Sequence, residues 1–144
     1  MSALENKAIV RRLYKEFFNE GNWAVADELF SPNYVNRVAP PGHPPGPEGV
    51  KRNGAMFRTA FPDFRVTIED LIADGDKVAV RFASSGTHKG TFLGVPPTGK
   101  RVEWAGIDMF TIAEGKLVEA WGYDDELGLM RQFGVVLPPG QTER

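Results

Sequence analysis

The sequence predicts an α+β domain, in which helices come first and a mostly antiparallel sheet follows. Apolar residues recur at helical spacing as far as residue 61. From residue 65 onward, alternating segments are joined by short turns that contain Asp-Gly or Glu-Gly. No repeat and no shift in composition divides residues 1–144, so one domain is expected. The last residues, 137–144, are expected to form a loose tail.

Three helices are expected in the first part of the chain. Ser2 and Glu5 have the spacing of a capping box and predict a helix that runs to about residue 19. A second helix is expected over residues 23–30. A third is expected over residues 47–61, where proline at the first helical position is favourable.

The segment from residue 31 to the third helix is expected to be a long loop. Its proline-rich part, residues 40–47, is expected to be stiff and unable to join a sheet, because proline donates no backbone hydrogen bond. Long loops in compact domains are often functional. Tyr34, Asn36 and His43 lie in this segment and could orient a carbonyl or phenol of a ligand, although turn formation and packing explain them equally well. Asn53, near the apolar side of the third helix, could project into the same pocket or occupy an ordinary boundary position.

Four strands are predicted in the second part of the chain. They are "RVTIEDLI", "KVAVRFASSGTHKG", "RVEWAGIDMFTI" and "KLVEAWGYD", and a short helix near residues 125–133 follows them. The last two strands carry large apolar side chains on both faces, whereas a sheet with one wet face alternates cleanly. The helices can cover only one face. The other is expected to form the interface of a homodimer, with Met109 and Trp121 as anchors.

Asp108 is the most informative polar residue of these strands. It stands between Ile107 and Met109 in a segment that is otherwise mostly apolar. A buried carboxylate must be paired, hydrogen-bonded or protonated. Burial in an apolar pocket would raise the pKa of Asp108 toward neutrality, which suits a general acid or base. The alternative is a structural carboxylate paired with Arg81, an arrangement that would lower that pKa.

Composition excludes several classes of function. The net charge of −2 provides no general attraction to nucleic acid or to an acidic membrane surface. The absence of cysteine rules out disulfides, a thiol nucleophile and a zinc–thiolate site, and two histidines are too few for a histidine-rich metal centre. Neither a secretion signal nor a run of 18 apolar residues is present, so a cytoplasmic location is expected. Neither a phosphate loop nor a nucleotide fingerprint is present.

The chain resembles the SnoaL-like polyketide cyclases, members of the NTF2-like superfamily. The resemblance rests on "GTHKGTFLGVPPTGKRV" and "IDMFTIAEGKLVEAWGYDDELGLMRQFG", with the shorter "SPNYVN", "GPEGV" and "TAFPDF", and it spans residues 7–136. It implies a cone-shaped barrel with three helices packed into the concave face of a curved sheet, a pocket inside the cone, and dimerisation through the back of the sheet. It also implies an enzyme without cofactor or metal that acts on a hydrophobic, carbonyl-bearing small molecule, by cyclase (aldol-type) or isomerase-type acid/base chemistry.

The catalytic residues that the resemblance implies are not present in their usual types. Family members close a ring by an intramolecular aldol reaction, with a carboxylate on the last long strand and a histidine on the strand before it. Here Asp108 stands at the histidine's position and Gly122 at the acid's. One interpretation is that the base has moved to Asp108 and that Gly122 makes room for a bulkier substrate. The other is that the protein binds a small molecule without catalysis.

Asp124 is a second catalytic candidate, since it shares a strand face with Gly122; together with Asp125 it could instead cap the last helix. Arg81, Asp108 and Asp124 could also form an Asp-Arg-Asp arrangement of the kind that hydrolyses epoxides. Other residues could line the pocket, although each could equally belong to the core or hold a loop: Phe57, Phe82, His88 and Trp104.

Overall fold

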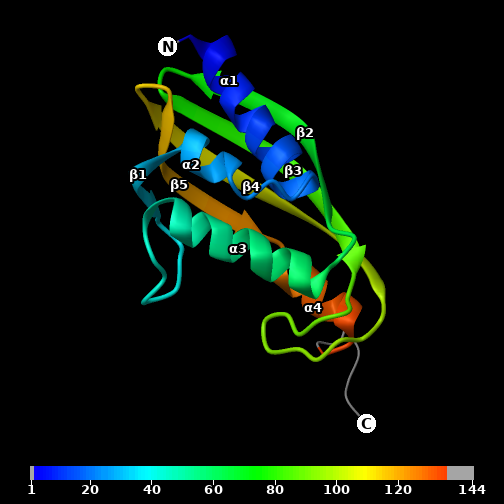
Figure 1. Ribbon diagram of the computed structural model, residues 1–144. Helices are drawn as coiled ribbons and strands as arrows, with labels where there is room; N and C mark the ends of the chain where they lie inside the picture. Colours follow the sequence, from blue (N-terminus) through cyan, green and yellow to red (C-terminus); the bar gives the residue numbers. More distant parts are fainter. Residues whose placement is uncertain (1, 136–144) are drawn as a thin grey trace.

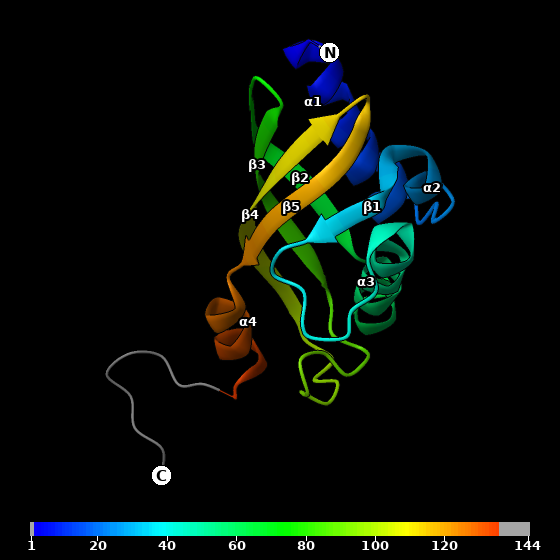
Figure 2. The ribbon, with the colours of Figure 1, turned by 90° about the vertical axis from the view of Figure 1, so that its left-hand side faces the viewer.

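The computed structural model describes residues 2–135, which form a five-stranded sheet and several helices (Figure 1). The elements in chain order are α1 (Ala3–Arg12), η1 (Leu13–Asn19), α2 (Val25–Leu29), β1 (Phe30–Asn36), α3 (Gly46–Ala60), β2 (Arg65–Asp74), β3 (Lys77–Thr87), β4 (Arg101–Ala113), β5 (Lys116–Asp124) and α4 (Glu126–Phe133). Helices α1, α2 and α3 lie on one face of the curved sheet, and α4 lies beyond the ends of its strands (Figure 2). The predicted α+β fold is confirmed, and the expected tail 137–144 lies outside the described residues.

The N-terminal helix begins as predicted. The Ser2 side chain accepts from the backbone N–H of Glu5, and the Glu5 side chain accepts from that of Ser2. From Leu13 the helix widens into the π-helical turns of η1, which end at Asn19. Such turns are rare and often occur at functional sites. Here they carry the side chains that pack onto the sheet.

The expectation of a loop over residues 31–46 is wrong for its first part. Phe30–Asn36 forms strand β1, which pairs in parallel with β5, and Asn36 lies opposite Ala120. Proline is tolerated in this strand because it lies at the edge of the sheet, where one side of the backbone needs no partner. The strand also explains why α2 ends at Leu29, one residue earlier than predicted.

The sheet has the order β1-β5-β4-β3-β2, and all pairs except β1·β5 are antiparallel. On β4 buried and exposed residues alternate, with Trp104 and Phe110 buried on the helix side. On β5 this alternation is interrupted, because the register shifts between Thr111 and Ile112 of β4. Leu117 therefore lies opposite Ile112 on the inner face, where it is fully buried.

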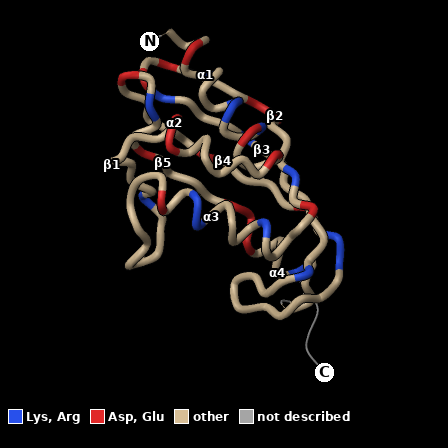
Figure 3. The backbone as a smooth tube through the Cα atoms, viewed as in Figure 1, with Lys and Arg blue, Asp and Glu red and all other residues tan. Residues whose placement is uncertain are grey.

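The core is built largely from aromatic side chains between the helices and the inner face of the sheet. Phe17 is fully buried and packs edge-on against Trp23, and Phe61 packs against Trp104 with its ring tilted. Acidic and basic residues are interspersed along the chain (Figure 3). Within residues 2–135, no helix has the length and apolar character needed to cross a membrane.

Candidate active site

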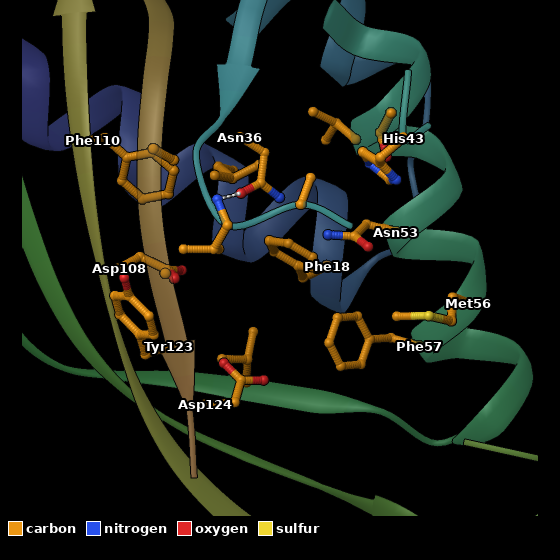
Figure 4. Close-up of a pocket in the computed structure, with 18 of the residues that line it drawn as sticks. Phe18, Asn36, His43, Asn53, Met56, Phe57, Asp108, Phe110, Tyr123 and Asp124 are labelled. Atoms are coloured by element: carbon orange, nitrogen blue, oxygen red, sulfur yellow. Dashed lines mark hydrogen bonds between the residues drawn. The ribbon is translucent and has the colours of Figure 1, made fainter. Parts of the chain in front are cut away.

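A cavity of about 440 Å³ lies between the inner face of the sheet and the helices (Figure 4). Its wall is rich in aromatic side chains, with Phe18, Phe30, Phe57, Phe64, Phe82 and Phe110 among the lining residues. Val38 and Met56 also line it and are exposed, so they mark its mouth. Such a mostly apolar cavity with a few polar groups is the usual form of a small-molecule site.

Asp108, on β4, is the central polar group of this cavity. The hydroxyl of Tyr14 donates a hydrogen bond to its Oδ2. Burial raises the pKa of Asp108 to about 7, the Tyr14 hydrogen bond opposes that shift, and the charge of Asp124 adds to it. Asp108 therefore gains and loses its proton near neutral pH, as a general acid or base requires.

Tyr14 comes from the first π-helical turn of η1 and was not identified from the sequence. Burial and the charge of Asp108 raise the pKa of Tyr14 well above its ordinary value, so its hydroxyl stays protonated and donates. The sequence nevertheless contains a feature that indicates a role for Tyr14. Tyr14 lies beside Leu13 and Phe17 on the buried side of the helix, and a buried tyrosine hydroxyl normally finds a partner.

Gly122 lies directly opposite Asp108 in the β4·β5 ladder. A Cβ atom at position 122 would stand 2.2 Å from Asp108 Oδ1, far closer than atoms can approach. The glycine thus leaves room for the carboxylate of Asp108. Gly122 is also among the residues that line the cavity. The interpretation that it makes room for a bulkier substrate stays a prediction.

The two adjacent acids at the end of β5 have different roles. Asp125 caps α4 by accepting from the backbone N–H of Gly128 at 2.9 Å. Asp124 faces the cavity, and its Oδ2 accepts from Trp104 Nε1 at 3.1 Å. Burial raises the pKa of Asp124, and the Trp104 hydrogen bond opposes that shift.

Four further polar side chains expected at a pocket line the cavity: Tyr34, Asn36, His43 and Asn53. Tyr34 is buried on β1, where burial and the charge of Asp108 raise its pKa, so its hydroxyl stays protonated. Asn36 Oδ1 accepts from the backbone N–H of Val38 at 3.1 Å (Figure 4). Asn53 projects from α3. Within residues 2–135, neither the Tyr34 hydroxyl nor the Asn53 amide has a hydrogen-bond partner, so both can bind a ligand.

Arg81 is not near Asp108. It lies opposite Ile107, on the outer face of the sheet, and its guanidinium pairs with exposed Asp70 at 2.7 Å. Asp108 lies opposite Val80, the neighbour of Arg81 on β3. Because adjacent residues of a strand face opposite sides of the sheet, the Arg81 side chain points away from Asp108. Arg81 therefore neither neutralises Asp108 nor completes an Asp-Arg-Asp arrangement with Asp124.

His88 and Trp104 also lie outside the cavity lining, whereas Phe57 and Phe82 belong to it as expected. His88 is fully buried: its Nδ1 accepts from the backbone N–H of Thr98 at 3.2 Å, and its ring stacks on Phe133. This arrangement anchors a loop. Trp104 acts on the cavity through its hydrogen bond to Asp124.

The charged residues that line the cavity are all acidic. They are Asp108, Asp124 and Glu126, and no described lining residue is Lys or Arg. An anionic ligand would meet carboxylates with no cation to offset them. Within residues 2–135, no three His, Asp or Glu side chains converge in a way that could hold a metal ion.

Comparisons with known proteins agree with this architecture. Residues 8–133 match the sequence model of the family described as SnoaL-like polyketide cyclase. Aklanonic acid methyl ester cyclase DnrD of Streptomyces peucetius is 29% identical over 134 residues, which cover 90% of this chain and 91% of the relative. Nogalonic acid methyl ester cyclase of Streptomyces nogalater is 28% identical over 129 residues, covering 88% and 96%.

Solved structures show the same fold. TsrD from Streptomyces laurentii superposes with a TM-score of 0.87 at 29% identity, covering 94% of this chain and 99% of TsrD. IdmH from Streptomyces antibioticus superposes with a TM-score of 0.77 at 33% identity, covering 90% and 99%. The predicted NTF2-like fold is thereby confirmed. With the family model matched over most of its length, the chain belongs to the SnoaL-like polyketide cyclase family.

Proposed function

We propose that this protein is a cofactor-independent cyclase that closes a ring in a neutral, carbonyl-bearing polyketide, with Asp108 as its general base. The observation that carries the proposal is the placement of Asp108. Its carboxyl group faces an aromatic cavity, is held by Tyr14, and has a pKa of about 7. A carbon acid flanked by carbonyls needs only such a base and a hydrogen-bond donor at the developing oxyanion.

The cavity supplies a group for each step of an aldol closure. Asp108 takes a proton from the carbon between two carbonyls, and the Tyr34 hydroxyl donates to the enolate oxygen. The enolate carbon attacks a second carbonyl carbon, which forms the C–C bond. The resulting alkoxide takes a proton from Asp108, which the first step has left in its acid form. The return of this proton restores the carboxylate of Asp108 and completes the cycle.

The chemistry of the cavity favours a substrate whose carboxyl groups are masked. No described lining residue is cationic, and the aromatic wall suits a planar, fused-ring skeleton. The named substrates of two relatives, aklanonic acid methyl ester and nogalonic acid methyl ester, carry such masked groups. These two esters are therefore the first substrates to assay.

The proposal is tested by Asp108→Asn with Asp70→Asn as the matched control. Both variants replace a carboxylate on the same sheet by its neutral isostere, but Asp70 is exposed on the outer face. We expect Asp108→Asn to lower kcat by about 10²–10⁴-fold while its circular dichroism and ligand binding persist, and Asp70→Asn to stay near wild type. Equal turnover in Asp108→Asn and wild type would exclude Asp108 as the base. Binding without turnover in wild type, for both esters, would favour the non-catalytic alternative.

We also propose that the protein is a homodimer through the outer face of its sheet. Two neighbouring rows of that face carry exposed apolar residues: Ile72, Met109 and Trp121 in one, Ile107 and Tyr123 in the other. Such a patch commonly marks an interface. Size-exclusion chromatography with light scattering should give a dimer for wild type and a monomer for Trp121→Glu. The cytoplasmic location stays a prediction from the sequence.

A further inference from the structure

The acids that line the cavity have no cation to balance them. Asp108 and Asp124 lie on β4 and β5, and Glu126 begins α4. Burial raises the pKa of Asp108 and of Asp124, and the next acid adds to each shift: the charge of Asp124 acts on Asp108, and that of Glu126 acts on Asp124. Within residues 2–135, every ion pair uses other acids. Whichever of these acids are ionised, the charge of the cavity is negative.

Aromatic side chains lie across the cavity from these acids. Phe18 and Phe57 point into it from the helices, on the side opposite β4 and Asp108 (Figure 4). The face of an aromatic ring attracts a cation, and it also packs against planar ligands. The wall therefore suits a flat molecule that carries a positive charge.

Two buried hydroxyl groups indicate independently that a polar ligand occupies this space. Tyr34 is 7% exposed and Ser84 is 3% exposed, and both line the cavity. In the part of the chain that the structure describes, neither hydroxyl has a hydrogen-bond partner. A buried polar group without a partner is costly, so both hydroxyls point to a ligand that supplies one.

Asp124 is the acid best placed to hold a positive group. Its Oδ2 accepts from Trp104 Nε1, which fixes the carboxylate, and its Oδ1 has no partner within residues 2–135. The charges of Asp108 and Glu126 act at the same end of the cavity. Water screens opposite charges less in such a partly buried site than at the surface, so their attraction is stronger here.

We propose that the cavity binds organic cations, namely planar and mostly apolar molecules that carry a protonated amine, with the ammonium group donating to Asp124 Oδ1 and the rings packed against the phenylalanines. A neutral ligand of the same shape gains the aromatic contacts but leaves the acids unbalanced. The inference extends the ligands of the cavity beyond neutral carbonyl compounds. It concerns binding alone and does not rest on turnover at Asp108.

A set of naphthalene derivatives of similar size separates charge from shape: 1-naphthylmethylammonium, 1-naphthalenemethanol and 1-naphthoate. At about pH 8 the amine and the naphthoate are ionised, and so is most of Asp108. Isothermal titration calorimetry at low ionic strength gives the dissociation constant and the stoichiometry for each compound. We expect the ammonium compound to bind one per chain and about tenfold or more tightly than the alcohol, and the naphthoate to bind more weakly than the alcohol.

Variants locate the cation. Asp124→Asn should remove most of the advantage of the ammonium compound over the alcohol, because it removes the charge that contacts the ammonium group, and should leave the dissociation constant of the alcohol within about twofold of wild type. Asp70→Asn removes an exposed acid from the outer face and should change neither constant.

Equal affinity for the ammonium compound and the alcohol in wild type would overturn the proposal, and this comparison depends on no variant folding. An advantage that folded Asp124→Asn keeps in full, or that Asp70→Asn removes, would overturn the placement of the cation at Asp124. Because no turnover is measured, failure of the cyclase assay leaves this comparison unaffected, and the two proposals are tested separately.

Discussion

The close approach of Gly122 to Asp108 makes a sharp test of the site. In Gly122→Ala the new Cβ would stand 2.2 Å from Asp108 Oδ1, about 1.2 Å short of ordinary contact at 3.4 Å. The methyl group is fixed to the backbone of a central strand, so the carboxylate must move by about that distance. A shift of this size breaks the alignment with Tyr14, because a hydrogen bond tolerates only a few tenths of an ångström.

Two magnitudes follow from this displacement. Overpacking a well-filled site costs about 1–3 kcal/mol of stability. A catalytic group misplaced by about 1 Å loses about 10²-fold in rate. Gly122→Ala should therefore unfold at lower urea concentration than wild type and cyclise its substrate about 10²-fold more slowly.

A double-mutant cycle shows whether the carboxylate is the cause. In an Asp108→Ala background the obstructing oxygen is gone, so adding Gly122→Ala should change the free energy of unfolding by less than about 0.5 kcal/mol. Urea denaturation of the four proteins, followed by tryptophan fluorescence, gives the coupling energy. An equal cost of Gly122→Ala in both backgrounds would refute the contact between position 122 and Asp108.

Three further predictions concern the titration of the same groups. The pKa of Asp108 rises to about 7 in the fold from an ordinary 3.8, so between these pH values the native state holds a proton that the unfolded chain has lost. The stability of wild type relative to Asp108→Asn, measured by urea denaturation, should therefore fall between about pH 4 and pH 7. A stability difference that does not change with pH would contradict this. The Tyr14 hydrogen bond lowers the pKa of Asp108, so Tyr14→Phe should move the acid limb of the kcat/KM profile to higher pH, whereas an unmoved limb would argue against that bond. Trp104→Phe removes the hydrogen-bond donor to Asp124. The loss should raise the pKa of Asp124, measured by carbon-13 NMR titration, and cost about 1–3 kcal/mol of stability. An unchanged titration of Asp124 would argue against the contact.

The order of helices and strands could be predicted from the sequence because the signals are local. The capping box at Ser2, proline near the start of α3 and the short turns between the strands all act within a few residues. Strand β1 was missed because its parallel partner is distant in sequence and because it contains a proline. The shift in register near Thr111 was missed because alternation assumes an unbroken ladder.

The site could be predicted from the sequence only where its residues lie on the same strand. Asp108 and Trp104 have the same parity on β4, so their common face could be read from the sequence. The partner of Asp108 could not, because Tyr14 reaches it across 94 residues of chain. Arg81 was misplaced for the same reason, since only the register with β4 shows that Val80 is the residue opposite Asp108.

The central claim is that the fold keeps Asp108 poised to exchange a proton near neutral pH. A carbon-13 NMR titration of the carboxyl carbons, assigned by comparison with Asp108→Asn, measures this without any substrate. The structure predicts a midpoint for Asp108 at about pH 7. A midpoint near 4, the ordinary value of an aspartate in water, would contradict the assignment of Asp108 as the base.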